Sequence, residues 1–253
     1  MFGSDLIEDR VINPKQKGPA IVPFITAGYP NKDDFLSLVK SLANCADVIE
    51  IGVPFSDPMA DGVTIQRSSH AAIESGVRLQ WILKQLKTIS IDTPIILMSY
   101  LNPLFVYGYV ELAQDSKDAG VDGFIVPDLP IEEGEELRKI MKQEGLGMIQ
   151  LVTPATPVER IKKIAEKSSG FLYAVTMKGV TGGSGGLPKE VTSYLKVVKS
   201  HTTIPVCAGF GVRSSNDVAL LEPFVDGVIV GSALVEAIED QASPIDFLNS
   251  LRF

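Results

Sequence analysis

The chain has 253 residues, of which 45% are hydrophobic and 21% are charged, so it can bury a large core and is unlike a disordered protein. Its formal net charge is −8, and lysine and arginine form no cluster, which argues against a surface that tracks the phosphates of nucleic acid.

Short apolar runs rich in β-branched residues recur along the chain, and each is followed by an amphipathic stretch with helical spacing. Strands that alternate with helices form right-handed βαβ units, and near-continuous apolar strands are covered on both faces, so we predict a parallel sheet between helices. The predicted strands are residues 20–25, 48–53, 94–100, 123–128, 148–153, 171–176, 205–209 and 227–231. The predicted helices are residues 31–42, 79–88, 109–119, 133–144, 157–167, 188–200, 214–221 and 233–240.

Eight such units favour closure of the sheet into one barrel over an open, doubly wound sheet. About 250 residues is a common size for such a barrel, although length alone would also permit two smaller domains. An open dinucleotide-binding sheet would carry G-x-G-x-x-G directly after its first strand, and this chain does not. The predicted fold class is therefore α/β, a single-domain (β/α)8 TIM barrel over residues 1–253.

The connections after the second and sixth strands are longer than the others, which predicts extended loops at residues 54–78 and 177–188. In a barrel of this kind, the loops that follow the strands form the face on which active sites are built. We therefore expect the functional site beside these two loops.

A carboxylate interrupts the second predicted strand. Alternation sends Glu50 to the same side as Val48 and Gly52, which is the interior of a barrel. An apolar surround raises the pKa of a carboxyl group toward the range that suits general acid–base catalysis. The loop that follows holds Asp57 and Asp61, and either could be a second, ionised carboxylate over the same pocket. Spacing does not choose between them.

Glycine-rich segments follow the last three strands, at residues 179–183, 209–211 and 231–232. Glycine allows backbone N–H groups to approach phosphate oxygens, and a helix that starts near Ser232 would direct its positive end at them. Together they predict a phosphate site. The glycine-rich segment 179–188 also predicts a lid over the site, and Lys178 just before it is a candidate for imine chemistry.

The residues also limit the other chemistry and the location. Cys45 and Cys207 lie in apolar segments and are expected to be buried, reduced thiols. Neither His70 nor His201 lies near a cluster of carboxylates or has another histidine two or four residues away, so no metal site is expected. Residues 1–18 lack the apolar core of a secretory signal and no apolar stretch is long enough to span a membrane, which predicts a cytoplasmic protein.

The segment EIGVPFSDPMADG at residues 50–62 resembles the motif of the tryptophan synthase alpha chain family, and the resemblance extends over nearly the whole sequence. It implies a TIM barrel that cleaves indole-3-glycerol phosphate to indole and glyceraldehyde 3-phosphate without a cofactor of its own. It also implies a beta chain as partner in an alpha2beta2 complex, with pyridoxal phosphate on the beta chain and indole passed to it. The supporting segments are PFITAGYP at 23–30, YLNP at 100–103, VPDLP at 126–130, GVTG at 179–182, GFG at 209–211 and GS at 231–232.

The resemblance also assigns roles to single residues. It makes Glu50 the acid and base of the cleavage, and Asp61 the ionised partner that holds the indole N–H. It places Asp57 and Asp128 where the family contacts its partner. It matches further residues to substrate-binding positions, namely Phe24, Met98, Tyr100, Tyr173, Thr181, Gly182, Gly211, Gly231 and Ser232.

Two other functions fit the residues. One is a barrel that binds a phosphorylated ligand and activates a partner without turnover, for which the Glu50 and Asp61 pair would have no use. The other is an aldolase that forms a Schiff base on Lys178.

Overall fold

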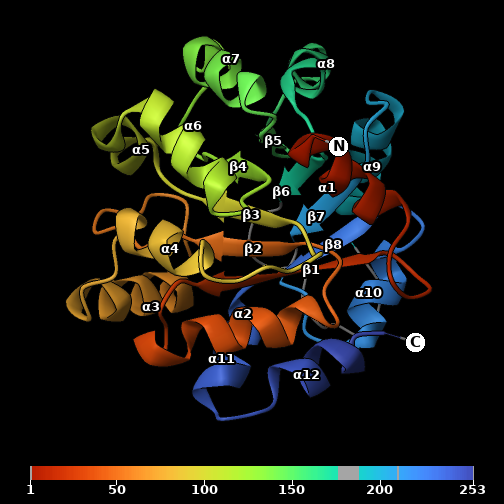
Figure 1. The fold of residues 1–253 in the computed structure, drawn as a ribbon. Helices are drawn as coiled ribbons and strands as arrows, with labels where there is room; N and C mark the ends of the chain where they lie inside the picture. Colours follow the sequence, from red (N-terminus) through yellow and green to blue (C-terminus); the bar gives the residue numbers. More distant parts are fainter. Residues whose placement is uncertain (1, 176–187, 210, 253) are drawn as a thin grey trace.

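The computed structural model describes residues 2–175, 188–209 and 211–252, and its eight strands form a closed parallel barrel in the order β1 to β8 (Figure 1). Closure comes from the pairing of β1 with β8, in which Ile21 lies opposite Val228. The predicted (β/α)8 barrel is thereby confirmed. The strands are β1 (Ala20–Thr26), β2 (Ile49–Gly52), β3 (Ile95–Met98), β4 (Gly123–Ile125), β5 (Gly147–Val152), β6 (Leu172–Val175), β7 (Val206–Gly209) and β8 (Gly227–Val230).

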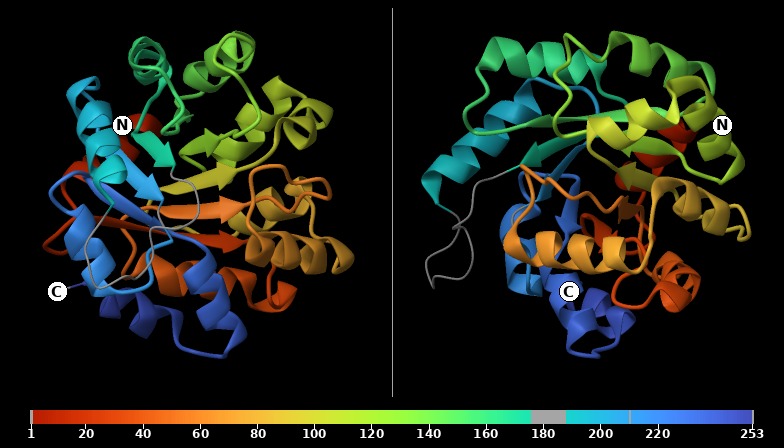
Figure 2. Two further views of the ribbon diagram at one scale, coloured as in Figure 1. Left: turned by 180° about the vertical axis from the view of Figure 1, so that it is seen from behind. Right: turned by 90° about the vertical axis from the view of Figure 1, so that its left-hand side faces the viewer.

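Helices surround the barrel on all sides (Figure 2). They include each predicted helix, with shifted ends, and four more, α1, α3, α5 and α12. The helices are α1 (Gly3–Ile12), η1 (Lys32–Asp34), α2 (Phe35–Ala43), α3 (Val63–Glu74), α4 (Leu79–Leu86), α5 (Leu101–Tyr107), α6 (Tyr109–Asp118), α7 (Glu135–Gln143), α8 (Val158–Lys167), α9 (Lys189–Ser200), α10 (Ser215–Leu221), α11 (Ser232–Glu239) and α12 (Pro244–Ser250).

The expected loop at 54–78 is therefore only partly loop, because α3 occupies residues 63–74. This helix has no apolar stripe for periodicity to detect. It packs through the small side chains of Ser68, Ser69 and Ala72, so its neighbours approach closely without large apolar residues. The second expected loop falls almost entirely on residues 176–187, which lie outside the described residues.

Two layers of apolar side chains form the core. Alternation along each strand sends one set outward against the helices, for example Ile49 and Ile51, and the other set inward, for example Val48. Cys207 belongs to the inner set, and both it and Cys45 are buried and not joined in a disulfide.

The first helix closes the base of the barrel. Ile7 and Val11 of α1 are fully buried and join the inner cluster of strand side chains. The Gly3 N–H donates to the Gly145 carbonyl oxygen at 2.7 Å, which ties the start of α1 to the segment before β5. The base is thus filled by side chains, and no helix of the described residues is long and apolar enough to cross a membrane.

A polar residue just before each even-numbered strand accepts a hydrogen bond from the preceding odd-numbered strand. Asp47 accepts from the Ile21 N–H at 2.8 Å, Asp122 from Ile95 at 2.9 Å and Asp226 from Val206 at 2.8 Å. Ser168 does the same for Gln150 in β5 at 2.9 Å. These bonds satisfy backbone N–H groups and hold neighbouring strands together at the base of the barrel.

Asp47 is the most heavily engaged of these residues. It is 0% exposed and also accepts the Lys15 N–H at 2.6 Å and the Arg252 guanidinium at 3.0 Å, so it joins both ends of the chain to the barrel.

We expect Asp47→Ala to lower the free energy of unfolding by about 3–5 kcal/mol, because it leaves the buried Arg252 guanidinium without its partner. Urea denaturation measures this loss. The matched control is Asp118→Ala, which removes an exposed ion pair with Lys87 and should cost less than about 1 kcal/mol. Equal losses for the two variants would contradict the structural role of Asp47.

Candidate active site

A cavity of about 210 Å³ opens at the carboxyl ends of the strands. Side chains from β1, β2, β3, β5, β6 and β8 converge on it, together with the loops after β2 and β7 and the start of α11. Eight of the residues singled out from the sequence line this cavity, namely Phe24, Glu50, Asp61, Met98, Tyr173, Gly211, Gly231 and Ser232.

Two interior glycines leave room for the aromatic walls of the cavity. A Cβ atom on Gly52 would come within 2.4 Å of the Phe24 ring, and one on Gly209 within 2.6 Å of the Tyr173 hydroxyl. Either contact would displace a ring of the cavity wall. The absence of side chains at these two positions lets Phe24 and Tyr173 line the cavity.

Glu50 lies inside the barrel, as alternation predicts, and is 1% exposed. Its Oε2 atom has no hydrogen-bond partner among the described residues. Burial raises the pKa of Glu50 to about 8, and the negative charge of Asp61 adds to the rise. At neutral pH the carboxyl group therefore holds its proton and faces the cavity as an acid.

Asp61 is held by a short relay of hydrogen bonds. The Ala60 N–H donates to the Tyr100 hydroxyl oxygen at 2.8 Å, and that hydroxyl donates to Asp61 Oδ2 at 3.1 Å. Phe55 stacks on the Tyr100 ring with centroids 4.9 Å apart, which fixes the direction of the hydroxyl. Asp61 thus receives support for a negative charge that Glu50 lacks.

The two carboxyl groups differ in environment in a way that separates their protonation. Burial raises the pKa of Asp61, but the hydrogen bond from Tyr100 opposes this rise. Burial also raises the pKa of Tyr100 to about 12, so the hydroxyl stays a donor. The arrangement can present a protonated Glu50 and an ionised Asp61 to one ligand, the division of labour expected of an acid and an electrostatic stabiliser.

Part of the cavity lining consists of backbone, at Gly211, Gly231 and Ser232. Gly211 has a φ of +65°, a conformation that favours glycine. Gly231 and Ser232 lead into the first turn of α11, whose N–H groups have no partners within the helix. This wall can accept an anion without a basic side chain.

The remaining predicted residues lie elsewhere. Tyr100 borders a smaller cavity with Asp61 and does not line the main one, so its contact is with the carboxylate. Asp57 accepts a hydrogen bond from Ser56 Oγ at 2.5 Å outside the cavity. Asp128 accepts the Leu101 N–H at 2.9 Å and so caps the start of α5. Thr181, Gly182 and Lys178, with most of the predicted lid, lie outside the described residues.

Several apolar lining residues were not singled out from the sequence, among them Leu151 and Ile229. Alternation along the strands could have identified both, because each faces inward near the end of its strand. Ile65 carried no such signal, since it belongs to the unpredicted helix α3.

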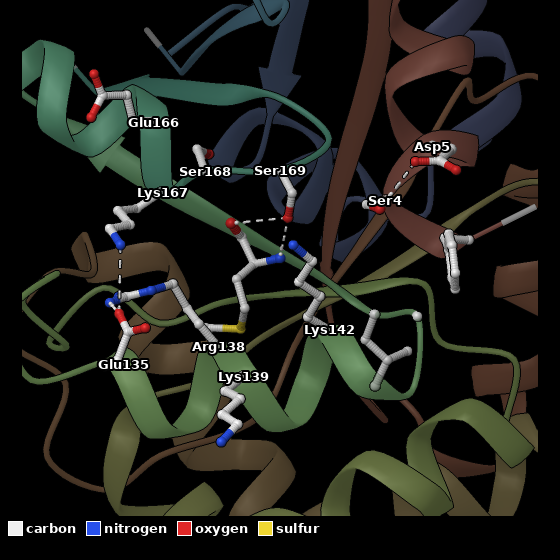
Figure 3. A pocket seen from close by; sticks show the side chains of 14 residues that line it. Ser4, Asp5, Glu135, Arg138, Lys139, Lys142, Glu166, Lys167, Ser168 and Ser169 are labelled. Carbon is white, nitrogen blue, oxygen red and sulfur yellow. Dashed lines mark hydrogen bonds and ion pairs between the residues drawn. The ribbon is translucent and has the colours of Figure 1, made fainter.

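A larger cavity of about 510 Å³ lies on the other side of the molecule, between α1, α7 and α8 at the start of β5 (Figure 3). Two of its cations, Arg138 and Lys167, are directed at Glu135 at 2.9 and 3.6 Å. Among the residues that the structure describes, no three His, Cys, Asp or Glu side chains are placed to share a metal ion. Neither Glu50 nor Asp61 lines this larger cavity, so the chemistry is assigned to the cavity at the strand ends.

Comparisons with known proteins give one consistent result. Residues 12–249 match the family model described as tryptophan synthase alpha chain. The alpha chain of Carboxydothermus hydrogenoformans is 44% identical over 224 residues, which is 87% of this chain and 84% of that one. The alpha subunit structure from Legionella pneumophila str. Paris has a TM-score of 0.87 at 34% identity, covering 100% of this chain and 97% of that one. The tryptophan synthase complex from Pyrococcus furiosus has a TM-score of 0.82 at 37% identity, covering 92% and 97%.

The raised pKa of Glu50 has a consequence for stability. The unfolded chain releases this proton near pH 4.5 and the folded chain near pH 8, so the native protein binds more protons between these values and its stability falls as pH rises. Glu50→Gln removes this effect. Between pH 5 and pH 8, we expect the unfolding free energy of wild type to fall by about 3 kcal/mol relative to that of the variant. A difference that is independent of pH in urea denaturation would contradict the buried, protonated state.

Proposed function

The chain belongs to the tryptophan synthase alpha chain family and is a carbon–carbon lyase that cleaves indole-3-glycerol phosphate, and we propose that Glu50 and Asp61 carry out this cleavage. The observation that carries the proposal is the buried, protonated Glu50 in the same cavity as an Asp61 that receives a hydrogen bond. The products are indole and glyceraldehyde 3-phosphate.

The proposed reaction is a retro-aldol step with two proton transfers. Glu50 donates its proton to C3 of the indole ring, and positive charge then develops at the ring nitrogen. Asp61 accepts a hydrogen bond from the indole N–H and stabilises that charge. The resulting Glu50 carboxylate takes the proton from the hydroxyl on the glycerol carbon that adjoins the ring. The carbon–carbon bond breaks as the aldehyde forms, the bonding electrons return to the indole, and Glu50 is protonated again.

The remaining groups of the cavity suit the two ends of this substrate. We assign Phe24, Met98 and Tyr173 to the indole ring, because their side chains form the apolar wall. Tyr100 acts through Asp61. Gly211, Gly231 and Ser232 are proposed to hold the phosphate through backbone N–H groups and the positive end of α11. Thr181 and Gly182 remain substrate-binding proposals that rest on the resemblance alone.

We expect Glu50→Gln to lower kcat for indole release at least about 1000-fold, since the amide neither donates nor accepts the required proton. Asp61→Asn should lower it about 100-fold or more through lost charge stabilisation. Indole formation from indole-3-glycerol phosphate, measured by chromatography, checks both. Unchanged affinity for glycerol 3-phosphate shows that the phosphate end is intact. Near-wild-type turnover in Glu50→Gln would refute the proposed mechanism.

The family's partner is a beta chain, which carries pyridoxal phosphate and consumes the indole, whereas the alpha chain has no cofactor. We propose that this partner docks beside the cavity mouth on an apolar rim, defined as Met59, Phe105, Val106 and Val110. These side chains are 52–80% exposed on the segments after β2 and β3. The loops after the strands share one end of the barrel, and exposed apolar side chains there can form a protein interface. Asp57 and Asp128 lie on the loops after β2 and β4 and are proposed as polar contacts of the same interface.

Phe105→Asp should weaken binding of a beta chain at least about 10-fold, because it places a charge in an apolar contact. The control Leu220→Asp changes a residue of α10 that is 41% exposed and should leave binding unchanged. Titration calorimetry with a purified beta chain measures both. Equal affinities for the two variants would place the interface elsewhere.

We further propose that residues 1–253 form one domain, since the first and last strands pair to close the barrel. We also propose a cytoplasmic location, in which the two free thiols stay reduced.

A further inference from the structure

Helices α3 and α11 each begin at one end of the proposed substrate site. Helix α3 begins at Val63, two residues after Asp61, and α11 begins at Ser232, directly after Gly231. The two helices pack against each other. Any shift of one helix along the other would therefore change the separation between Asp61 and the phosphate-binding backbone.

Two carboxylates of α11 form hydrogen-bonded bridges to α3. Glu236 Oε1 accepts the Thr64 hydroxyl at 3.0 Å, and its Oε2 accepts the Arg213 guanidinium at 2.8 Å. Arg213 follows Gly211 by two residues in the loop after β7. Glu236 thus joins α3 to the loop after β7 and to α11. These are the two segments proposed to hold the phosphate, and we call them the phosphate wall. The hydrogen bond from Arg213 lowers the pKa of Glu236, so the carboxylate is charged at neutral pH.

The second bridge lies one turn further along both helices. Glu239 accepts Arg67 through two bonds, Nη2 to Oε2 at 2.5 Å and Nε to Oε1 at 3.2 Å. The Tyr29 hydroxyl donates to the same Oε1 atom at 2.5 Å, which adds the loop after β1. A bidentate contact between guanidinium and carboxylate fixes orientation as well as distance.

The two bridges are in register. Thr64 and Arg67 are three residues apart on α3, and Glu236 and Glu239 are three apart on α11, so each pair lies on one face of its helix. A single bridge would let the helices pivot, whereas two bridges fix both the axial position and the rotation of α3. We name this set of four side chains the α3–α11 ladder.

We propose that Glu236 and Glu239 are positioning residues for the cleavage, because they hold the helix that follows Asp61 at a set distance from the phosphate wall. This inference rests on the proposed function. One substrate spans both ends of the cavity, so the phosphate aligns the indole N–H with Asp61 only if that separation is constant. Misplacement of a reacting group by about 1 Å can cost about 100-fold in rate.

The test uses Arg67→Met and Glu239→Gln, measured with a saturating beta chain. We expect each to lower kcat for indole release about 10-fold with KM changed less than about 2-fold, because phosphate binding is intact while alignment is lost. The concentration of active sites is measured by titration with glycerol 3-phosphate. Unfolded protein is therefore not counted when kcat is calculated. Arg67→Lys, which keeps the charge and one hydrogen bond, should recover part of the loss.

The control is Lys87→Met, which removes an exposed 2.8 Å ion pair with Asp118, between the end of α4 and the end of α6. It should match wild type. If Arg67→Met and Glu239→Gln also match wild type within 2-fold, the ladder is structural only and the inference is overturned while the proposed function stands. If wild type itself releases no indole, the proposed function fails and the inference fails with it.

Discussion

In the closed sheet β1 pairs with β8, so all eight strand ends meet around one opening and no edge is left for another strand. Residues far apart in sequence, such as Phe24, Asp61 and Ser232, then line the same cavity. The closure depends on hydrogen bonds at the base as well as within the sheet. Asp47, Asp122 and Asp226 each accept a hydrogen bond from a backbone N–H near the start of a neighbouring strand. The relative positions of the site residues at one end of the barrel therefore depend on the hydrogen bonds that hold the strands at the other end.

The cavity contains a polar group whose burial costs stability. A carboxyl oxygen of Glu50 is buried without a partner, which costs stability that an apolar residue of similar size would not. The two apolar clusters of the core contribute the burial that offsets this cost. Asp61 differs because Tyr100 donates to it, and the same hydroxyl accepts the Ala60 N–H. Two chemically similar side chains thus acquire different proton affinities from their neighbours alone.

The fold was predictable because parallel strands buried on both faces are nearly continuous apolar runs, and because alternation alone sends Glu50 inward. Helix α3 was not, since it packs through Ser68, Ser69 and Ala72 rather than through an apolar stripe. The residues left Asp57 and Asp61 equivalent by spacing. What separates them is a contact across 39 positions, the bond from the Tyr100 hydroxyl to Asp61, which no local pattern contains. Contacts of that range also form the α3–α11 ladder, in which Glu239 meets Arg67 across 172 positions.

Helix α1 closes one end of the barrel and leaves the other end open. Its side chains Ile7 and Val11 fill the base, and the inner apolar cluster fills the space between the base and Glu50. A molecule in the cavity therefore has no passage through the barrel axis. Whatever enters by the mouth must also leave by it, so the two fragments of a cleaved substrate share one exit. Any control over the order in which they depart must therefore act at the mouth of the cavity.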